Sequence, residues 1–327
     1  MSRKITGIGE TILDIVFKDN KPVAAVPGGS TFNAIISLGR TAGRDFKDVE
    51  VSMVTDIGDD HVADIVTSFM EANGVDTQNV TRYKNARTNI SLAFLDSNSN
   101  AHYQFYKDHF DSSQREEKLA SITFEKDDLV LFGSYFVINP ELRSFVAPLL
   151  QRAHEAGAIL CYDVNIRKNH LDQMPRIYGN IVENCRVSDI VRGSSEDFEM
   201  LLGIKDPEEI YRKYIKALCP IFICTCGPDP IHIFTPDRHI TIPVPRIVPV
   251  STIGAGDNFN AGLLYSLLAK DLRKADLATL SSEQLTDIAA IADSFSIEVC
   301  CSMDNYVGKN FRAIPDCHRH QEPDTDC

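Results

Sequence analysis

The chain has 327 residues, of which 43% are hydrophobic, and it carries a formal net charge of −13. This length and apolar content allow one large domain with a buried core. The negative charge argues against nucleic acid or an anionic membrane surface as the main partner.

The amino terminus runs directly into a strand pattern and lacks the long apolar core of a signal peptide. No stretch approaches the length of a membrane-spanning helix. The nine cysteines include Cys161 and Cys224, which lie inside apolar runs and are expected to be buried free thiols. We therefore expect a cytoplasmic protein, and because there is no CxxC pair, a zinc site has no support.

Strand-like and helix-like patterns alternate along most of the chain. In chain order they predict a strand at 4–8, a helix at 31–42, a strand at 50–55, a helix at 60–73, a strand at 129–132, a helix at 140–156, strands at 159–163 and 221–225, and helices at 257–270 and 282–299. Such alternation predicts an α/β fold, with a largely parallel sheet covered by helices on both faces.

Two segments, 12–26 and 89–107, interrupt this alternation with period-two apolar patterns around turns at 18–22 and 96–100. We expect antiparallel hairpins that together form a small β-sheet lid over the carboxyl edge of the main sheet, where α/β proteins bind ligands. Two surface hairpins without a lid role are the alternative. Residues 1–312 then form one domain with the lid segments inserted, and 313–327 form a polar, flexible tail.

The lid also leads to a prediction about assembly. Its alternation creates two apolar faces, and the main domain can cover only one of them. We therefore expect a homodimer in which two lids pack on each other. The rival arrangement is a monomer whose lid folds onto the core.

A glycine turn followed by an apolar helix is the strongest local signal, and it reads Gly254-Ala255-Gly256. Glycine lets the backbone approach a ligand, and the first amides of a helix lack internal partners and carry partial positive charge. The turn is therefore predicted to bind a phosphate, and Asp257 can take a proton from a hydroxyl that attacks this phosphate. The alternative is a structural turn in which Asp257 caps the helix.

Three motifs resemble the PfkB/ribokinase family of sugar and nucleoside kinases. Thr-x-Gly-Ala-Gly-Asp, ending at Asp257, is similar to the second signature of that family. Gly-Gly-x-x-x-Asn, ending at Asn33, resembles the first signature, and Gly-Glu-x-x-x-Asp, ending at Asp14, resembles the amino-terminal pattern. The resemblance runs from about residue 4 to about residue 308 and implies a ribokinase-like fold, a Rossmann-like core with a β-lid.

The resemblance also implies roles for individual residues. It assigns catalysis to Asp257, Gly254, Ala255, Gly256 and Arg167. It assigns sugar binding to Asp14, Gly28, Gly29, Asn33, Asn165 and Arg167. It assigns nucleotide binding to Thr225, Gly227, Gly254 and Gly256. It assigns support of a metal ion, mostly through water, to Asp197, with its neighbour Glu196 as the alternative.

The chain departs from the family pattern at three places. Ser251 stands where ribokinase-type members usually carry an aspartate that helps to bind a monovalent cation, so potassium activation is in question. Gly227-Pro-Asp-Pro230 replaces the nucleotide-binding Gly-x-x-Gly. Lys107 stands where many fructokinase-like and ketodeoxygluconate-kinase-like members have arginine.

These features predict ATP-dependent phosphorylation of a hydroxyl on a small, fructose-like sugar, with Mg²⁺ bound to the nucleotide. The chain contains no GxxxxGK[ST] loop, which excludes a P-loop kinase. The alternatives are a nucleoside kinase of the adenosine-kinase type and a non-catalytic sugar-binding regulator on the same scaffold.

Overall fold

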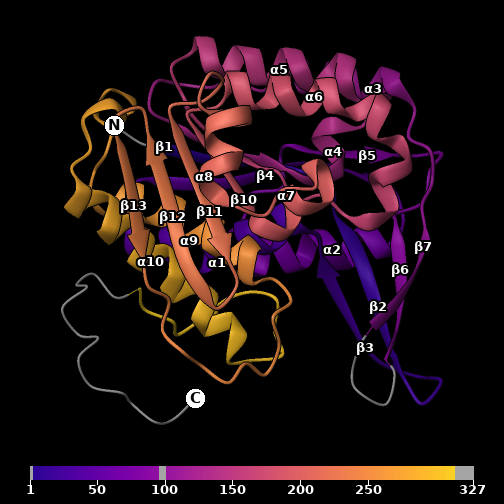
Figure 1. Ribbon diagram of the computed structural model, residues 1–327. Coiled ribbons are helices and arrows are strands. Elements are labelled where there is room, and N and C mark those ends of the chain that lie inside the picture. The colour runs from indigo at the N-terminus through magenta and orange to yellow at the C-terminus, as the bar shows by residue number, and fades with distance from the viewer. Residues whose placement is uncertain (1–2, 96–100, 314–327) are drawn as a thin grey trace.

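A nine-stranded sheet runs through the centre of the protein in the computed structural model, which describes residues 3–95 and 101–313 (Figure 1). Its strand order is β13 (Arg238–Ile242), β12 (Asp229–Thr235), β11 (Ile221–Cys226), β10 (Ile190–Ser194), β9 (Ile159–Asp163), β8 (Leu129–Gly133), β1 (Arg3–Ile8), β4 (Val49–Gly58) and β5 (Val80–Tyr83). The strands from β11 to β5 are parallel, and β12 and β13 extend one edge in antiparallel fashion.

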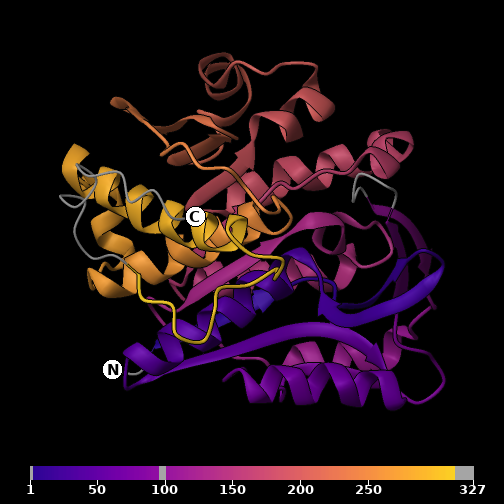
Figure 2. The same ribbon diagram turned by 90° about the horizontal axis from the view of Figure 1, so that it is seen from below.

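Helices cover both faces of this sheet, and two hydrophobic clusters hold them there (Figures 1 and 2). One face carries α1 (Ser30–Asp45), α2 (His61–Ala72), α9 (Ala255–Ala269) and α10 (Ser282–Cys300). The other face carries α3 (Ser112–Ser121), α5 (Arg143–Glu155), α6 (Met174–Val187), α7 (Ser195–Leu202) and α8 (Pro207–Ile210). The predicted α/β class, a mostly parallel sheet between two helical layers, is confirmed.

Several elements differ from the prediction. The helix predicted at 140–156 begins only at Arg143, because Asn139 first forms a turn in which its carbonyl accepts the amide of Leu142 at 3.0 Å. The helices α3, α6, α7 and α8, the short helix α4 (Ser134–Ile138) and the strands β5, β10, β12 and β13 were not predicted. Most of these elements are too short for a period to be recognised, but α6 has 14 residues and was missed as well.

The remaining helical turns are short. They are η1 (Lys168–Gln173), η2 (Tyr211–Ile215) and η3 (Lys274–Thr279). Among residues 3–95 and 101–313, no helix combines the length and apolar character needed to cross a bilayer. Cys161 and Cys224 are buried free thiols in β9 and β11, as predicted. The predicted tail lies, apart from Ala313, outside the described residues, as does the predicted turn at 96–100.

The two segments that interrupt the alternation form one separate sheet of four strands, which we call the lid sheet. Its order is β3 (Lys21–Gly28), β2 (Ile12–Lys18), β6 (Ile90–Leu95) and β7 (Ala101–Tyr106). Each hairpin is antiparallel, but β2 and β6 pair in parallel, so the prediction of antiparallel strands is wrong for the central pair. The reason is that β2 follows β1 and β6 follows β5, and both leave the same carboxyl edge of the main sheet.

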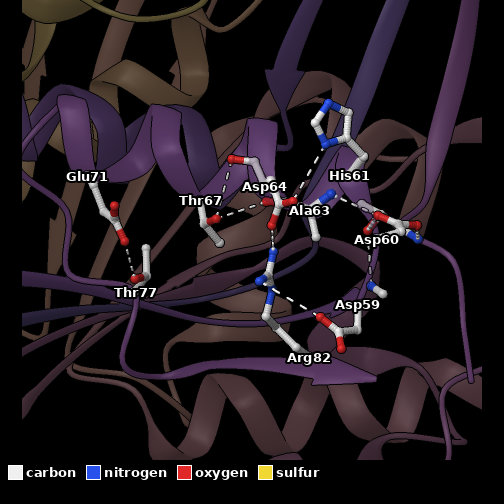
Figure 3. A network of polar contacts seen from close by, with 11 residues as sticks. Asp59, Asp60, His61, Ala63, Asp64, Thr67, Glu71, Thr77 and Arg82 are labelled. Atoms are coloured by element: carbon white, nitrogen blue, oxygen red, sulfur yellow. Dashed lines mark hydrogen bonds and ion pairs between the residues drawn. The ribbon is translucent and has the colours of Figure 1, made fainter. Parts of the chain in front are cut away.

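A polar network at the start of α2 anchors the base of the lid sheet (Figure 3). Asp60 caps α2 by accepting the amide of Ala63 at 2.8 Å. The same carboxylate accepts the amide and the hydroxyl of Thr88, which lies two residues before β6. Arg82 on β5 donates to Asp64 on α2 at 2.5 Å. The entry of the second hairpin is therefore fixed to the main domain.

Candidate active site

The glycine turn begins α9, which starts at Ala255, two residues earlier than predicted. Gly254 is the N-cap with φ of 80°, a left-handed conformation that favours glycine. A Cβ atom at this position would lie 2.9 Å from the carbonyl oxygen of Asn305, so the turn also needs the missing side chain. The first amides of α9 therefore lie at a close-packed glycine turn with the positive end of the helix dipole.

Asp257 lies in the first turn of α9 and is 8% exposed. Its carboxylate accepts the Nδ2–H of Asn33 on α1 at 2.8 Å. It does not cap the helix, so the alternative interpretation as a helix cap is wrong. Burial raises the pKa of Asp257, the hydrogen bond from Asn33 and the charges of Arg167 and Arg192 oppose this increase, and the nearby Asp163 adds to it, with a net pKa of about 7. Asp257 can therefore exchange a proton near neutral pH.

Asp14 on β2 is the predicted sugar-binding residue of the lid sheet. Its side chain accepts a hydrogen bond from the hydroxyl of Ser91 on β6, across the parallel pair. Burial raises the pKa of Asp14, while Ser91 and the guanidinium of Arg167 oppose the increase. The charge of Arg167 lowers the pKa values of both Asp14 and Asp257, so this guanidinium is close enough to act on both carboxylates.

Asn33 provides a second polar group at the same place. Its amide nitrogen is bonded to Asp257, but its Oδ1 atom is buried and has no hydrogen-bond partner among the described residues. A buried acceptor without a partner is costly unless a ligand supplies a donor, and a sugar hydroxyl is one such donor. Next to it, Gly29 has φ of 127° and a Cβ there would overlap the backbone of Glu10, so the chain passes close at this point.

Arg192 on β10 was missed by the sequence analysis. Its guanidinium donates to the Oδ1 atom of Asp163 at 3.1 Å and to the hydroxyl of Thr225 at 2.6 Å. A Cβ atom at Gly256 would lie 2.8 Å from this guanidinium, so its positive charge lies against the glycine turn. An arginine inside the short apolar strand of residues 190–194 was the signal that could have revealed it.

The predicted nucleotide-binding residues lie on the same edge of the sheet. Thr225 is on β11, where its hydroxyl is bonded to Arg192, and Gly227 follows in an exposed turn with φ of 62°. Asn165 lies two residues after β9 with φ of 35°, a conformation that asparagine tolerates better than most residues. Thr225 and Gly227 thus lie at β11, and Asn165 and Arg167 follow β9, two strands away in the sheet. The other predicted sugar residues, Asp14, Gly28, Gly29 and Asn33, lie on the lid sheet and at the start of α1.

The sequence from residue 2 to residue 294 matches the pfkB family carbohydrate kinase. The chain belongs to this family. It is 28% identical over 285 residues to a fructokinase of Rhizobium leguminosarum bv. trifolii, which covers 85% of this chain and 84% of the relative. It is 25% identical over 277 residues to a probable fructokinase-2 of Arabidopsis thaliana, with 81% of each chain covered.

Solved structures share the fold at lower identity. A fructokinase from Vibrio cholerae O395, bound to fructose, ADP and calcium ion, superposes with a TM-score of 0.77 at 19% identity and covers 93% of this chain and 94% of that one. An aminoimidazole riboside kinase from Salmonella enterica superposes with a TM-score of 0.74 at 20% identity, covering 92% and 94%. The ribokinase-like fold is thus confirmed, and the protein is an ATP-dependent carbohydrate kinase.

Asp197, the predicted metal-supporting residue of this pfkB kinase, is already engaged on both oxygens. Its Oδ1 atom accepts the amide of Ile166 at 2.9 Å, and its Oδ2 atom accepts the amide of Ser194 at 2.8 Å. The residue is 7% exposed, and the described residues hold no group of three potential metal ligands. The geometry therefore fits a metal ion held mainly by nucleotide phosphates and water, with the exposed Glu196 next to it.

Proposed function

We propose that the protein transfers the γ-phosphate of ATP to a hydroxyl of a small, fructose-like sugar, and that Asp257 is the general base. The observation that carries this proposal is the buried carboxylate of Asp257, with a pKa of about 7, in the first turn of the helix that begins at Gly254. A base with a pKa near the working pH is the most effective at neutral pH.

The sugar is held between the lid sheet and α1. Asp14 accepts hydrogen bonds from sugar hydroxyls on one side, and the unpaired Oδ1 atom of Asn33 accepts another hydrogen bond from the core side. The backbone of Gly28 and Gly29 lets the sugar ring approach the chain closely. These contacts orient one hydroxyl toward Asp257, and this orientation supplies much of the rate increase in phosphoryl transfer.

The phosphate is held at the start of α9. As Asp257 removes the proton from the sugar hydroxyl, the hydroxyl oxygen attacks the γ-phosphorus in line and the bond to the ADP oxygen breaks. The amides of Gly254, Ala255 and Gly256 stabilise the negative charge on the transferred group, and Arg167 faces it from the substrate side. Thr225 and Gly227 contact the nucleotide. Mg²⁺ on the phosphates, supported through water by Asp197, supplies charge neutralisation.

The direct test of the proposal is turnover of ATP against a panel of neutral ketoses, aldoses, acid sugars and nucleosides. We expect a neutral ketose to give the highest kcat/KM among the unsubstituted sugars. Turnover only with nucleosides would favour the nucleoside kinase instead. Binding of sugar without turnover of ATP on any compound would favour the non-catalytic regulator.

Potassium should activate this enzyme weakly or not at all. Ser251 offers only a neutral hydroxyl, and its oxygen already accepts the amide of Ile253 at 3.2 Å. A carboxylate is the stronger ligand for a cation in water, because it brings charge as well as oxygen. Turnover should be compared in sodium, potassium and tris buffers at equal ionic strength. A large rise in potassium alone would show that other groups complete a cation site.

We also propose that the protein forms a two-fold dimer through the lid sheet. The face opposite Asp14 carries Ile15, Phe17, Leu92 and Phe94, with the two phenylalanine rings stacked at 4.9 Å. An apolar face on a small sheet is stable in water only when it is covered. Light scattering at micromolar concentration should give the mass of a dimer, and a clean monomer mass with and without sugar would contradict the dimer.

A further inference from the structure

A cavity of about 650 Å³ lies beside Glu10, the residue between β1 and the lid sheet. It is lined by residues at the ends of β4 and β5, at both ends of the second lid hairpin, in α3 and around α4. Asp14, Asn33 and Asp257 do not line it, so it is a separate space. Pockets of roughly 300–1,000 Å³ hold ligands larger than one sugar ring.

The strand order shows how the cavity relates to the reaction. Along the carboxyl edge, the predicted nucleotide residues Thr225 and Gly227 lie at β11, and the predicted sugar residues Asn165 and Arg167 follow β9. The cavity is lined by Asp56 on β4 and Tyr83 on β5, at the other end of the strand order. Glu10 belongs to both regions, because it lines the cavity and its backbone touches Gly29. A substituent on a sugar that is bound beside Gly29 can therefore extend past Glu10 into this cavity.

The floor of the cavity is rigid and polar. The guanidinium of Arg115 lies 2.8 Å from the carboxylate of Asp56, and their side chains are 4% and 6% exposed. Tyr83 donates its hydroxyl to the same carboxylate at 3.0 Å, and its ring lies 4.8 Å from that of Phe110. A paired, buried floor beside aromatic rings is preorganised for a ligand and needs no rearrangement to receive one.

The charge of the cavity selects the kind of ligand. Two of its cations are neutralised locally, because Arg115 is paired with Asp56 and Lys107 contacts both oxygens of Glu10 at 2.6 and 2.8 Å. Further carboxylates on Asp108 and Glu141 line the same cavity. The amides of Arg87 and His109 hold the pKa of Asp108 below its usual range, so this group is charged at neutral pH. An anionic ligand is disfavoured here, and a cation is favoured.

We propose that this cavity is a second subsite, which takes an amine-bearing substituent on the end of the sugar remote from the phosphorylated hydroxyl. The inference rests on the proposed sugar kinase function and makes the substrate class more specific. The natural substrate is then a sugar extended by a protonated amine, and the bare sugar is a poorer substrate. The amine lies between the carboxylates of Asp108 and Glu141, and the aromatic rings cover its carbon chain.

Three probes test the subsite: D-fructose, a 1-amino-1-deoxy-D-fructose whose nitrogen carries an aminoalkyl chain, and the matched compound whose chain ends in a carboxylate. All three leave the hydroxyl on carbon 6 free. We expect kcat/KM for the aminoalkyl compound to exceed that for D-fructose and for the carboxylate compound by about tenfold or more, the scale of one good charge-assisted contact. Equal values, or a preference for the carboxylate, would overturn the proposal.

Substitutions in the cavity test whether the preference for the aminoalkyl compound arises there. Glu141→Gln removes one carboxylate, and Gln114→Trp fills the cavity from α3. Both should reduce the preference for the aminoalkyl compound at least fivefold. Gln151→Trp on the exposed surface of α5 is the matched control and should leave the preference unchanged. An undiminished preference in both cavity variants would overturn the assignment of the site.

The subsite and the sugar kinase function can fail separately, and titration calorimetry without ATP distinguishes the two. If the wild type phosphorylates none of the probes but binds the aminoalkyl compound, and Gln114→Trp does not bind it, the subsite stands and the assigned reaction is wrong. If D-fructose is phosphorylated and the aminoalkyl compound neither binds nor reacts, the reaction stands and the subsite is wrong.

Discussion

Asp257→Asn should reduce kcat by two or more powers of ten while leaving the affinity for ATP within a few-fold of the wild type. General-base catalysis contributes roughly 10²–10⁴ to a rate, and asparagine cannot accept the proton of the sugar hydroxyl. The amide still accepts the hydrogen bond from Asn33, so the local packing is preserved. Steady-state kinetics with ATP and the best sugar of the panel measure the change. Near wild-type turnover would show that another group is the base.

The pH dependence of turnover provides a second test of the role of Asp257. Only the ionised carboxylate can accept the proton, so kcat/KM of the wild type should fall about tenfold per unit as the pH drops below about 7. Asp257→Asn should not show this decrease of kcat/KM below pH 7. Because the pKa of Asp257 is raised from 3.8 to about 7 in the folded state, the free energy of unfolding falls as the pH rises from about 4 to about 7 and this loss is complete above about 7. Asp257→Asn should therefore be at least as stable as the wild type at pH 8.

A carboxylate that is exposed at the other end of α9 supplies the control. Asp271 follows this helix and its side chain is 78% exposed. Its φ of 47° is a conformation that asparagine accepts as readily as aspartate. Asp271→Asn thus removes one negative charge from the same helix without touching the glycine turn. Asp271→Asn should keep the turnover of the wild type and its decrease below pH 7. This result would separate the role of Asp257 from a general effect of charge.

The main fold could be predicted because its long elements have clear periods. The predicted strands β1, β4, β8, β9 and β11 are largely buried apolar runs, and α1, α9 and α10 carry continuous apolar faces that pack on one side of the sheet. The strand β10 was missed, because Arg192 and Gly193 interrupt its apolar pattern. The parallel pairing of β2 with β6 could not be predicted. It joins residues such as Asp14 and Ser91, 77 positions apart, and no local pattern specifies such a contact.

The candidate site was predicted where a motif carries its residues. Asp14, Asn33, Arg167 and Asp257 come from four separate elements, and the family resemblance alone brought them together in advance. The hydrogen-bond partners of these residues could not be predicted from the sequence. Ser91, for example, is an ordinary strand residue until the lid sheet places it against Asp14. A sequence motif contains the residues that are proposed to perform the chemistry, whereas the contacts that support these residues depend on tertiary packing.

The support beneath the glycine turn leads to the last prediction, for Arg192→Met. The guanidinium of Arg192 is paired with the buried carboxylate of Asp163, and their side chains are 8% and 4% exposed. Burial raises the pKa of Asp163 and Arg192 lowers it, so loss of the guanidinium leaves an unpaired carboxyl in the core. Breaking a buried pair in this way costs about 3–5 kcal/mol of unfolding free energy. Urea unfolding of the variant should show a loss of this size.

A double variant, Arg192→Met with Asp163→Asn, separates stability from function. With no buried charge left unpaired, most of the lost unfolding free energy should return, because removing both partners of a buried pair is often close to neutral. Turnover should stay low, since no positive charge then lies against Gly256 and the hydroxyl of Thr225 has lost its donor. The expected signature is a higher KM for ATP at restored stability. Recovery of wild-type turnover along with stability would mean that Arg192 only holds the fold and does not assist the phosphate site.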